Sequence, residues 1–321
     1  MVGSNVVRRL LANRSIERVV VVDNFSSGKR EHLEPFVTDP RLEVVYGDLE
    51  EDPDWMLHVK ANRGPLDTVI HLVANPDISK AVDDPGIDFR QGTVPMNNLL
   101  EVMRESEIKN LLYLSGSGVY GEHRGDLVPF TEDYGPCIPI STYAASKLAC
   151  EAMIAAHCHM FGLRARVLRP ANIVGPNQTH GVSYDFLHQL LDHPTHLRIL
   201  GDGRQSKSYI YVDDLIDALF QAEAGGLAAS YVVYNVASFS AITVNDVAAI
   251  ALEVCGLNPS RVTITHTEGI RGWRGDVPII RLDCQRLLAL GWAPHCNSYA
   301  AVQKGLLDLY GKATHSSRPS S

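Results

Sequence analysis

The sequence predicts an α/β fold in which helices cover both faces of a parallel sheet, joined to a smaller α/β domain. Over the first two-thirds of the 321-residue chain, short runs rich in β-branched residues alternate with helical stretches, which is typical of such a sheet. The run at residues 18–22 is too apolar for a strand with one face in water, so we expect it to be buried on both sides. A chain of this length is sufficient for one large or two moderate domains.

The expected elements divide the chain near Pro170. Before it, we expect strands at residues 18–22, 42–46, 68–73, 110–115 and 164–169, and helices at 4–12, 94–106 and 142–161. After it, we expect helices at 184–191, 213–224, 243–254, 281–290 and 299–310, and strands at 208–212, 232–236 and 262–266. Residues 1–170 should form the main domain and 171–312 a smaller one, with segments near 208–254 returning to the main sheet; the Ser-rich residues 313–321 should be a disordered tail.

Composition excludes several classes of protein. The net charge of −8 argues against sequence-independent nucleic-acid binding, which needs a basic surface. No apolar run approaches the roughly 20 residues of a membrane span, so no membrane partner is expected. The six cysteines are scattered without a C-x-x-C pair, which indicates reduced thiols in a cytoplasmic protein. The histidines show no metal-ligand spacing, since His157 and His159 point to different faces of a helix, and we predict no metal site.

The most informative stretch is the start of the helix predicted at residues 142–161. Tyr143 and Lys147 lie four residues apart, on one face and one turn from each other. An ammonium beside a phenol favours phenolate, and a phenolate is a general base suited to a sugar hydroxyl. The same spacing also fits a plain amphipathic helix with a surface lysine.

An acidic residue at the end of an apolar strand indicates a dinucleotide site. Asp23 ends such a run, leads into Asn24, Ser27 and Gly28, and follows Gly3 by about 20 residues, as expected for the acid that binds the adenosine ribose. A carboxylate there would repel a 2′-phosphate, so NAD is favoured over NADP. The alternative is that Asp23 opens a turn with Asn24.

Together with Gly47-Asp48-Leu49 and His71-Leu72-Val73-Ala74-Asn75, these motifs make the chain resemble the extended short-chain dehydrogenase/reductases. Within that superfamily it is most similar to the NAD-dependent epimerase/dehydratase family, and there to the UDP-glucose 4-epimerases. The resemblance implies a Rossmann-type doubly wound sheet in residues 1–170, NAD as cofactor, a nucleotide-sugar substrate and a homodimer formed through the helices at about 94–106 and 142–161.

The resemblance also implies cofactor contacts. Asp48 and Leu49 correspond to a pair flanking the adenine, and the loop after the third strand lines the dinucleotide through its backbone, while His71 is expected to be a packed histidine. The cofactor residues implied are Gly3, Asp23, Asn24, Ser27, Gly28, Asp48, Leu49, Leu72, Val73, Ala74, Tyr143, Lys147 and Pro170.

On the substrate side, three residues match diphosphate contacts of the family. Asn172 matches an asparagine that contacts the diphosphate, although it could equally cap its loop. Arg274 matches an arginine clamp, for which a guanidinium is well suited because it binds phosphate bidentately. Lys207 stands where relatives often carry arginine, and lysine keeps the charge but loses the fork. Asp213 and Asp214 are expected to cap the helix that follows them.

The implied reaction is epimerisation at C4 of a nucleotide-linked hexose. Tyr143 would take the 4-hydroxyl proton while hydride passes to the nicotinamide, Lys147 would hold the nicotinamide ribose and lower the pKa of Tyr143, and hydride would return to the other face of the 4-keto sugar. Related dehydratases need an Asp-Glu pair before Val119, and decarboxylases usually carry Ser-Glu. Ser117-Gly118 stands there instead, which disfavours both.

Three departures from the family accompany the match. Gly116 stands where relatives carry the catalytic Ser or Thr, so Ser115 or, preferably, Ser117 would substitute. Gly92 replaces an asparagine near the nicotinamide. The first strand and two glycines of the Gly-x-x-Gly-x-x-Gly turn are absent before Gly3; their loss would leave the ladder groups of two neighbouring strands unpaired, and we expect a truncated N-terminus.

Two alternatives stay open. The chain could be another enzyme on the same scaffold, a decarboxylase, dehydratase or reductase. It could also be a catalytically impaired protein that binds NAD or a sugar nucleotide, which the missing glycine turn and Gly116 favour and the intact Tyr143, Lys147 and Arg274 oppose.

Overall fold

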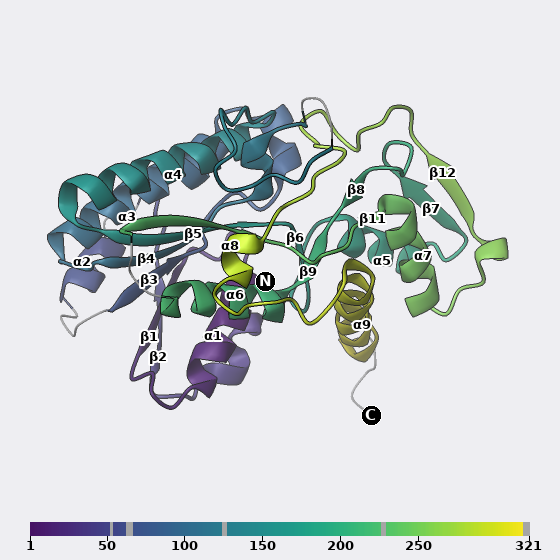
Figure 1. Cartoon of the computed structure of the whole chain (residues 1–321). Coiled ribbons are helices and arrows are strands. Elements are labelled where there is room, and N and C mark those ends of the chain that lie inside the picture. The colour runs from purple at the N-terminus through teal and green to yellow at the C-terminus, as the bar shows by residue number, and fades with distance from the viewer. Residues whose placement is uncertain (52–53, 62–66, 124–126, 226–228, 317–321) are drawn as a thin grey trace. The chain divides into compact units, whose positions relative to one another are not determined.

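The computed structural model describes residues 1–51, 54–61, 67–123, 127–225 and 229–316 (Figure 1). The chain divides into two compact units. The first comprises Met1–Gly116, Thr142–Arg169 and Leu219–Tyr234, and the second comprises Ser117–Ser141, Pro170–Ala218 and Asn235–Ser321. One change of unit falls at Pro170, while residues 117–141 group with the second unit and residues 219–234 with the first.

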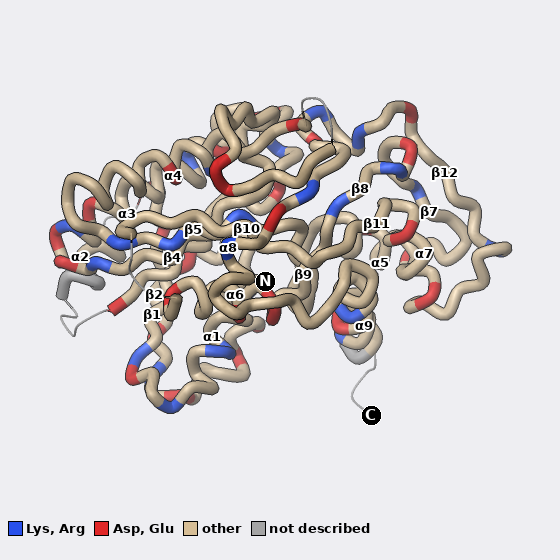
Figure 2. The backbone as a smooth tube through the Cα atoms, in the orientation of Figure 1, with Lys and Arg blue, Asp and Glu red and all other residues tan. Residues whose placement is uncertain are grey.

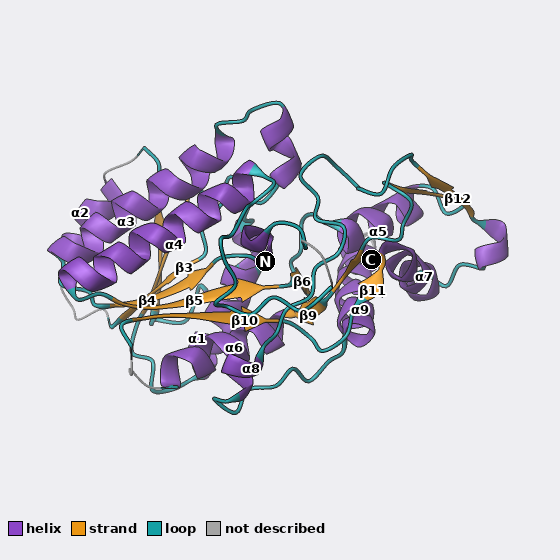
Figure 3. Cartoon of the chain, turned by 45° about the horizontal axis from the view of Figure 1, so that its top comes forward, coloured by secondary structure: helices purple, strands orange, loops and turns teal. Residues whose placement is uncertain are grey.

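The first unit contains the predicted parallel sheet. Its strand order is β10-β5-β4-β3, with β3 at Thr68–His71, β4 at Asn110–Leu114, β5 at Arg164–Pro170 and β10 at Tyr231–Val236. The β3–β4 and β4–β5 pairs are parallel. Figure 3 shows α3 (Val94–Glu105) and α4 (Thr142–Phe161) along one face of this sheet and α1 (Val2–Ala12) on the other. The α/β fold with helices on both faces is therefore confirmed.

A second, two-stranded parallel sheet lies in the same unit, formed by β1 (Val19–Asp23) and β2 (Leu42–Tyr46). Within the described residues β1 is hydrogen-bonded only to β2, and β3 only to β4, so the parallel sheet is interrupted between β1 and β3. Such an interruption leaves two strand edges unpaired, as the sequence led us to expect. It also explains why only Val19 of β1 is buried, and the prediction of a strand buried on both sides is wrong.

The core of the first unit explains why α3 and α4 form where they do. Both helices turn apolar faces toward β4 and β5, and burial of these faces stabilises helix and sheet together. α2 (Asp54–Ala61) adds Trp55 to the same cluster. The buried side chains at its centre include Met96, Leu100, Met103, Leu111, Ile154 and Val167.

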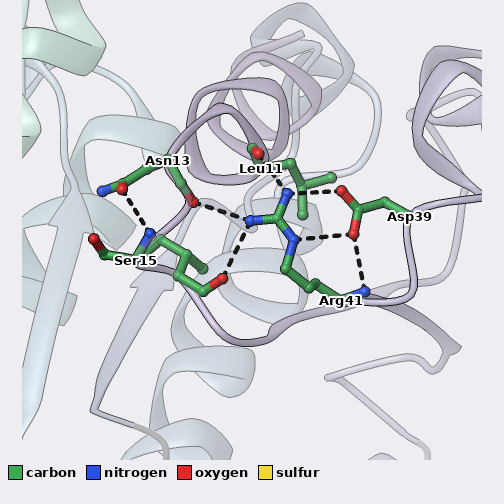
Figure 4. Close-up of polar contacts among 6 residues, drawn as sticks. Leu11, Asn13, Ser15, Asp39 and Arg41 are labelled. Atoms are coloured by element: carbon green, nitrogen blue, oxygen red, sulfur yellow. Dashed lines mark hydrogen bonds and ion pairs between the residues drawn. The ribbon is translucent and has the colours of Figure 1, made fainter.

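Arg41 ties the end of α1 to the loop before β2 (Figure 4). Its guanidinium donates to the carbonyl oxygens of Leu11 at 2.5 Å, Asn13 at 3.0 Å and Ile16 at 3.2 Å, and the Asp39 carboxylate holds it in place at 2.7 Å. Carbonyls at a helix end have no partner within the helix, so Arg41 satisfies groups that the helix leaves open. The hydrogen bond to Asp39 also raises the pKa of Arg41.

The second unit combines three small strand pairs with a group of helices. The pairs are β6 (Asn172–Val174) with β9 (Tyr209–Tyr211), β7 (His196–Ile199) with β12 (Thr263–His266), and β8 (Ser206–Lys207) with β11 (Ile242–Thr243). The helices are α5 (Val182–Asp192), α6 (Val212–Ala224), which continues into the first unit, α7 (Val244–Val254), α8 (Gln285–Leu288) and α9 (Ser298–Ser316). Thr243 caps α7 through a capping box with Asp246.

Several elements of the second unit differ from the prediction. α8 is shorter than the expected helix at 281–290, because Leu282 pairs with Phe130 and Arg281 donates to the Ser206 carbonyl. α9 runs to Ser316, so the first part of the expected disordered tail is helical, and residues 317–321 lie outside the described residues. Asp214 does not serve as the expected cap: its buried carboxylate accepts hydrogen bonds from the backbone amides of His295 and Cys296.

Acidic and basic residues are interspersed along the backbone (Figure 2). Among the helices that the structure describes, none is long and apolar enough to cross a membrane. All six cysteines are free thiols.

Candidate functional site

The structure brings Tyr143 and Lys147 together at the carboxyl end of β4. Both project from the first turns of α4, one turn apart, and the Lys147 ammonium lies 5.6 Å from the centre of the Tyr143 ring. Lys147 is buried and donates a hydrogen bond of 2.8 Å to the carbonyl oxygen of Leu114, the last residue of β4. The ring of Tyr113 lies 5.0 Å from the same ammonium. The backbone at the end of β4 therefore determines where Lys147 points.

The electrostatics of this pair differ from the expectation. Removal from water, together with the nearby Asp88 carboxylate, raises the pKa of Tyr143 to about 12. Burial lowers the pKa of Lys147 to about 8, opposed by Cys150 and Glu151. In the protein chain alone, desolvation of the phenol therefore determines the direction of the shift, and a lowering of the Tyr143 pKa by Lys147 stays a prediction.

Asp88 was not predicted from the sequence, although it organises the start of α4. It is almost completely buried, and its carboxylate accepts hydrogen bonds from Asn75 at 3.0 Å and from Thr142 at 2.7 Å. It thus joins the loop after β3 to the residue before Tyr143. The contacts span tens of residues in sequence, so no local spacing could have revealed them; the only signal was Asn75, at the end of the motif after the third strand.

The three residues after β4 distinguish the two candidate serines. Ser115 is buried and its hydroxyl donates at 2.5 Å to the Glu151 carboxylate. A Cβ added at Gly116 would lie 3.9 Å from the Tyr143 ring, in ordinary van der Waals contact, so a side chain at this position would face the phenol. Ser117 is half-buried, and no described residue hydrogen-bonds its hydroxyl. Of the two serines, Ser117 has the hydroxyl that a ligand could use.

The space at Gly92 is also accounted for. Gly92 lies in a π-helical turn, Phe89–Thr93, and a Cβ there would come within 2.5 Å of the Ser146 hydroxyl. That hydroxyl donates to the Asp88 carbonyl at 2.8 Å and lies 2.9 Å from the Thr93 hydroxyl. Ser146 from α4 therefore occupies the space into which a side chain at position 92 would project.

The residues predicted to bind adenosine converge at the carboxyl ends of β1 and β2. The Asp23 carboxylate accepts a hydrogen bond from the Phe25 amide at 2.7 Å, and a Cβ at Gly28 would lie 3.3 Å from its other oxygen. The Asn24 amide donates to Asp48 at 2.9 Å and so joins the loops after the two strands. Ser27 is exposed on the same loop. A glycine that lets the loop close over the ribose-binding acid fits an adenosine nucleotide.

Gly3 and the loop after β3, both predicted to contact the cofactor, also lie together. Gly3 is in the first turn of α1, and a Cβ there would lie 3.8 Å from the Leu72 side chain, so this helix end lies beside the loop that follows β3. Val73 and Ala74 continue this half-buried loop. The first turn of α1 carries no acidic residue, which suits an anionic group at a helix N-terminus. These residues fit NAD.

Two further residues predicted to contact the cofactor, and the histidine predicted to be packed, are buried. Leu49 is buried, and its carbonyl accepts a hydrogen bond from Asn98 at 2.8 Å. Pro170 is buried at the end of β5. His71 stacks on Tyr113 with ring centres 5.8 Å apart, and burial lowers its pKa to about 3. His71 is therefore neutral and packed, as expected.

The predicted substrate residues lie in the second unit and differ in availability. Lys207 forms an ion pair with Asp276. Asn172 begins β6, and its side chain lies near Tyr209. Burial raises the pKa of that phenol to about 12, although Asn172 acts to lower it. Arg274 is exposed, and no hydrogen bond or ion pair joins it to a described residue. Arg274 is thus a cation that an anionic ligand could engage without displacing a protein partner.

The loop that carries Arg274 is closed by Asp276. The Asp276 carboxylate accepts from the Gly272 amide at 3.1 Å, and its carbonyl accepts from Arg271 at 2.6 Å. The ring of Trp273 occupies the space into which a side chain at Gly275 would project, at 2.4 Å. Gly275 therefore serves the packing of Trp273.

One group of residues places possible metal-ligand atoms together. Atoms of Asp214, Asp217 and His295 lie within 4.8 Å of one another. The Asp214 carboxylate already accepts two backbone hydrogen bonds and a third from the His295 ring at 2.7 Å. We assign no metal to this group, because its buried carboxylate is used in tying down the segment before α9.

Comparison with known proteins agrees with this geometry. A model of the NAD dependent epimerase/dehydratase family matches residues 1–237. The chain is 34% identical over 232 residues to a UDP-glucose 4-epimerase of Mycolicibacterium smegmatis, covering 70% of this chain and 71% of the relative. A crystal structure of UDP-galactose 4-epimerase has a TM-score of 0.84 at 35% identity and covers 97% of this chain and 96% of that chain.

Dehydratases are also among the relatives. A trifunctional UDP-glucose 4,6-dehydratase/UDP-4-keto-6-deoxy-D-glucose 3,5-epimerase/UDP-4-keto-L-rhamnose-reductase of Arabidopsis thaliana is 26% identical over 316 residues. That match covers 96% of this chain and 45% of the relative.

The parallel sheet, the acid at the end of β1 and these likenesses define a Rossmann-fold protein with NAD as its cofactor. The chain belongs to the NAD-dependent epimerase/dehydratase family, as its motifs predicted, and it is an enzyme of this nucleotide-sugar family. The predicted fold class, family and cofactor are confirmed. The roles of individual residues stay predictions.

A pH titration tests the environment of Tyr143. Without NAD we expect no ionisation of this phenol up to its ordinary value of 10.0, since its pKa is raised to about 12. With NAD the ionisation should move to lower pH, because the positive charge of the nicotinamide ring favours phenolate. Ultraviolet difference spectra between the parent protein and Tyr143→Phe isolate the signal. Ionisation below the ordinary value without NAD, or no movement when NAD binds, would contradict the expectation.

Proposed function

We propose that this enzyme epimerises C4 of a nucleotide sugar of the UDP-glucose/UDP-galactose type through a transient 4-keto intermediate. The observation that carries the proposal is the position of Tyr143 and Lys147 together at the carboxyl end of β4, where Lys147 donates to the Leu114 carbonyl. A phenol with no protein partner among the described residues is suited to exchanging a proton with a ligand. The 34% and 35% identities to enzymes named as 4-epimerases support the same activity.

The chemistry divides between cofactor and protein. When bound, NAD supplies the hydride acceptor and donor. Tyr143 takes the proton from the 4-hydroxyl and returns it, and Lys147 binds the nicotinamide ribose while Leu114 holds its ammonium. The Ser117 hydroxyl donates to the sugar 4-oxygen in place of the serine that relatives carry at position 116. Because burial raises the pKa of Tyr143, the phenol needs added positive charge before it can act as a base.

The substrate diphosphate is assigned to Arg274, Lys207 and Asn172. Arg274 is the strongest candidate of the three, since it is exposed and unpaired among the described residues and can bind phosphate with two parallel hydrogen bonds. Lys207 would attract the diphosphate through its positive charge, part of which its ion pair with Asp276 already offsets. The Asn172 side chain would exchange or share its contact with Tyr209.

Dehydration and decarboxylation are the main alternatives on this scaffold, and the carboxylates near the segment do not favour them. Glu122 pairs with Arg271 at 2.5 Å. Glu151 is buried against Arg169 and Ser115. Neither is left to act as the acid that eliminates water from the sugar. The other alternative is a catalytically impaired protein that binds NAD or a sugar nucleotide. The interruption of the sheet between β1 and β3 is the observation in its favour.

We further propose a homodimer and a cytoplasmic location. The dimer would form through α3 and α4, where Met160 and Phe161 are 67% and 40% exposed at the end of α4. Exposed apolar side chains of this kind are suited to a helix–helix interface. Six free thiols fit a reducing compartment.

The proposed activity predicts a defined product pattern. The purified protein with NAD should interconvert UDP-glucose and UDP-galactose, followed by NMR, and Tyr143→Phe should lower kcat by at least about 100-fold because it removes the general base. Tyr299→Phe removes an exposed phenol that bonds Glu253 and should keep parental activity. UDP-GlcNAc and UDP-glucuronate, tested in parallel, identify other activities. Release of CO₂ or a 6-deoxy product, or full activity of Tyr143→Phe, would refute the proposal.

The role of Ser117 can be tested by loss and restoration. Ser117→Ala should lower kcat about tenfold, the effect of losing one hydrogen bond to the reacting oxygen. Adding Gly116→Ser should restore activity, since the new Cβ lies 3.9 Å from Tyr143 and meets no closer atom. Ser260→Ala, on an exposed turn, serves as the control. Parental activity of Ser117→Ala would assign the contact elsewhere.

A further inference from the structure

Three successive residues at the end of β4 are each held by one face of α4. Tyr143, Lys147 and Glu151 follow one another at four-residue intervals and so share this face. Lys147 donates to the Leu114 carbonyl, and Glu151 accepts from the Ser115 hydroxyl. The third residue, Gly116, lies near Tyr143, since a Cβ added there would be 3.9 Å from the ring. Two of the three helix residues belong to the proposed chemistry, and Glu151 has no part in it so far.

Glu151 is deeply buried and compensated. Its side chain is 3% exposed, and Arg169, at the end of β5, donates to both of its oxygens, at 3.0 Å and 2.5 Å. The Ser115 hydroxyl adds a hydrogen bond of 2.5 Å. The Ser115 amide also donates to the Leu168 carbonyl at 2.8 Å, so β5 holds the same residue from its other side. Ser115 is thereby bound through both its backbone and its side chain.

A contribution to stability does not account for this arrangement. Desolvation of two charges consumes much of what their attraction returns, and apolar pairs of similar volume often replace buried ion pairs without loss of stability. The specific consequence of Glu151 is geometric. Its carboxylate accepts the Ser115 hydroxyl and so fixes the side chain of the residue that follows Leu114.

We propose that Glu151 is a positioning residue. Through Ser115 its carboxylate holds the backbone between Leu114, whose carbonyl orients Lys147, and Gly116, which lies near Tyr143. The inference rests on the proposed function for its catalytic consequence. Without Glu151 the Ser115 hydroxyl loses its acceptor, and the Leu114–Ser117 segment can shift relative to α4. A displacement of about 1 Å in reacting groups is sufficient to slow catalysis about 100-fold.

Two variants separate positioning from stability. Ser115→Ala removes the contact and leaves the Glu151–Arg169 pair intact. The double variant Glu151→Met/Arg169→Met replaces the pair by apolar side chains, so that no buried charge is left alone. Glu43→Met/Arg18→Met makes the same double change at a half-exposed ion pair beside the amino ends of β1 and β2 and serves as the matched control.

The measurements are thermal unfolding, kcat and KM for the nucleotide sugar, and NAD affinity by equilibrium titration. We expect both test variants to unfold close to the parent temperature while kcat falls about 10- to 100-fold. KM should change less than about threefold, because Arg274 is untouched, and NAD should bind about three- to tenfold more weakly, because Lys147 is less well oriented. The control should match the parent.

The combination of variants gives a second criterion. Because Ser115 and Glu151 act as a unit, adding Ser115→Ala to Glu151→Met/Arg169→Met should lower kcat little further. Parental kcat and NAD affinity in Ser115→Ala would overturn the proposal, as would losses that appear only together with a lowered unfolding temperature. If the parent epimerises no sugar, the proposed function fails, and NAD affinity alone then decides whether Glu151 positions Lys147.

Discussion

The site depends on the packing of α4 against the carboxyl end of β4. Lys147 reaches the last carbonyl of that strand, and its direction is therefore set by sheet backbone that Val167 and Leu168 of β5 hold from the other side. Tyr143, one turn earlier, is set by the same helix. Sites built on helices and strands are held more precisely than sites on loops, so a pair placed here needs little further ordering when ligands bind.

The burial that orders Tyr143 and Lys147 also opposes ionisation of the Tyr143 phenol. Burial raises the pKa of Tyr143 to about 12, so the protein alone favours a neutral phenol. Burial also lowers the pKa of Lys147 to about 8. A positively charged nicotinamide changes the balance, because it adds charge in a desolvated site where charge acts strongly. In the reaction we propose, the phenolate of Tyr143 would therefore form mainly when oxidised NAD is bound.

The sequence was sufficient for elements whose signal is local. Residues 142–161 are helical as predicted, because nearly every residue there is a good helix former, and the strand at 42–46 is also as predicted. Short strands such as β6 and β8 were missed because their pairing, not their composition, makes them strands. In the site, Tyr143 and Lys147 could be found by spacing. Asp88 and the choice between Ser115 and Ser117 could not, because their partners Thr142 and Glu151 are tens of residues away.

The interrupted sheet changes what joins the two ends of the cofactor site. The residues predicted to bind adenosine follow β1 and β2, whereas Tyr143 and Lys147 lie beside β4, and no ladder hydrogen bond connects β1 to β3 among the described residues. Packing makes the connection instead: Val22 and Val69, on the two interrupted strands, both border the core cluster. Apolar contact is less directional than a strand ladder. The span between the ribose-binding acid and the catalytic pair is therefore set less rigidly than either end, and NAD itself, bound to both, would complete the link.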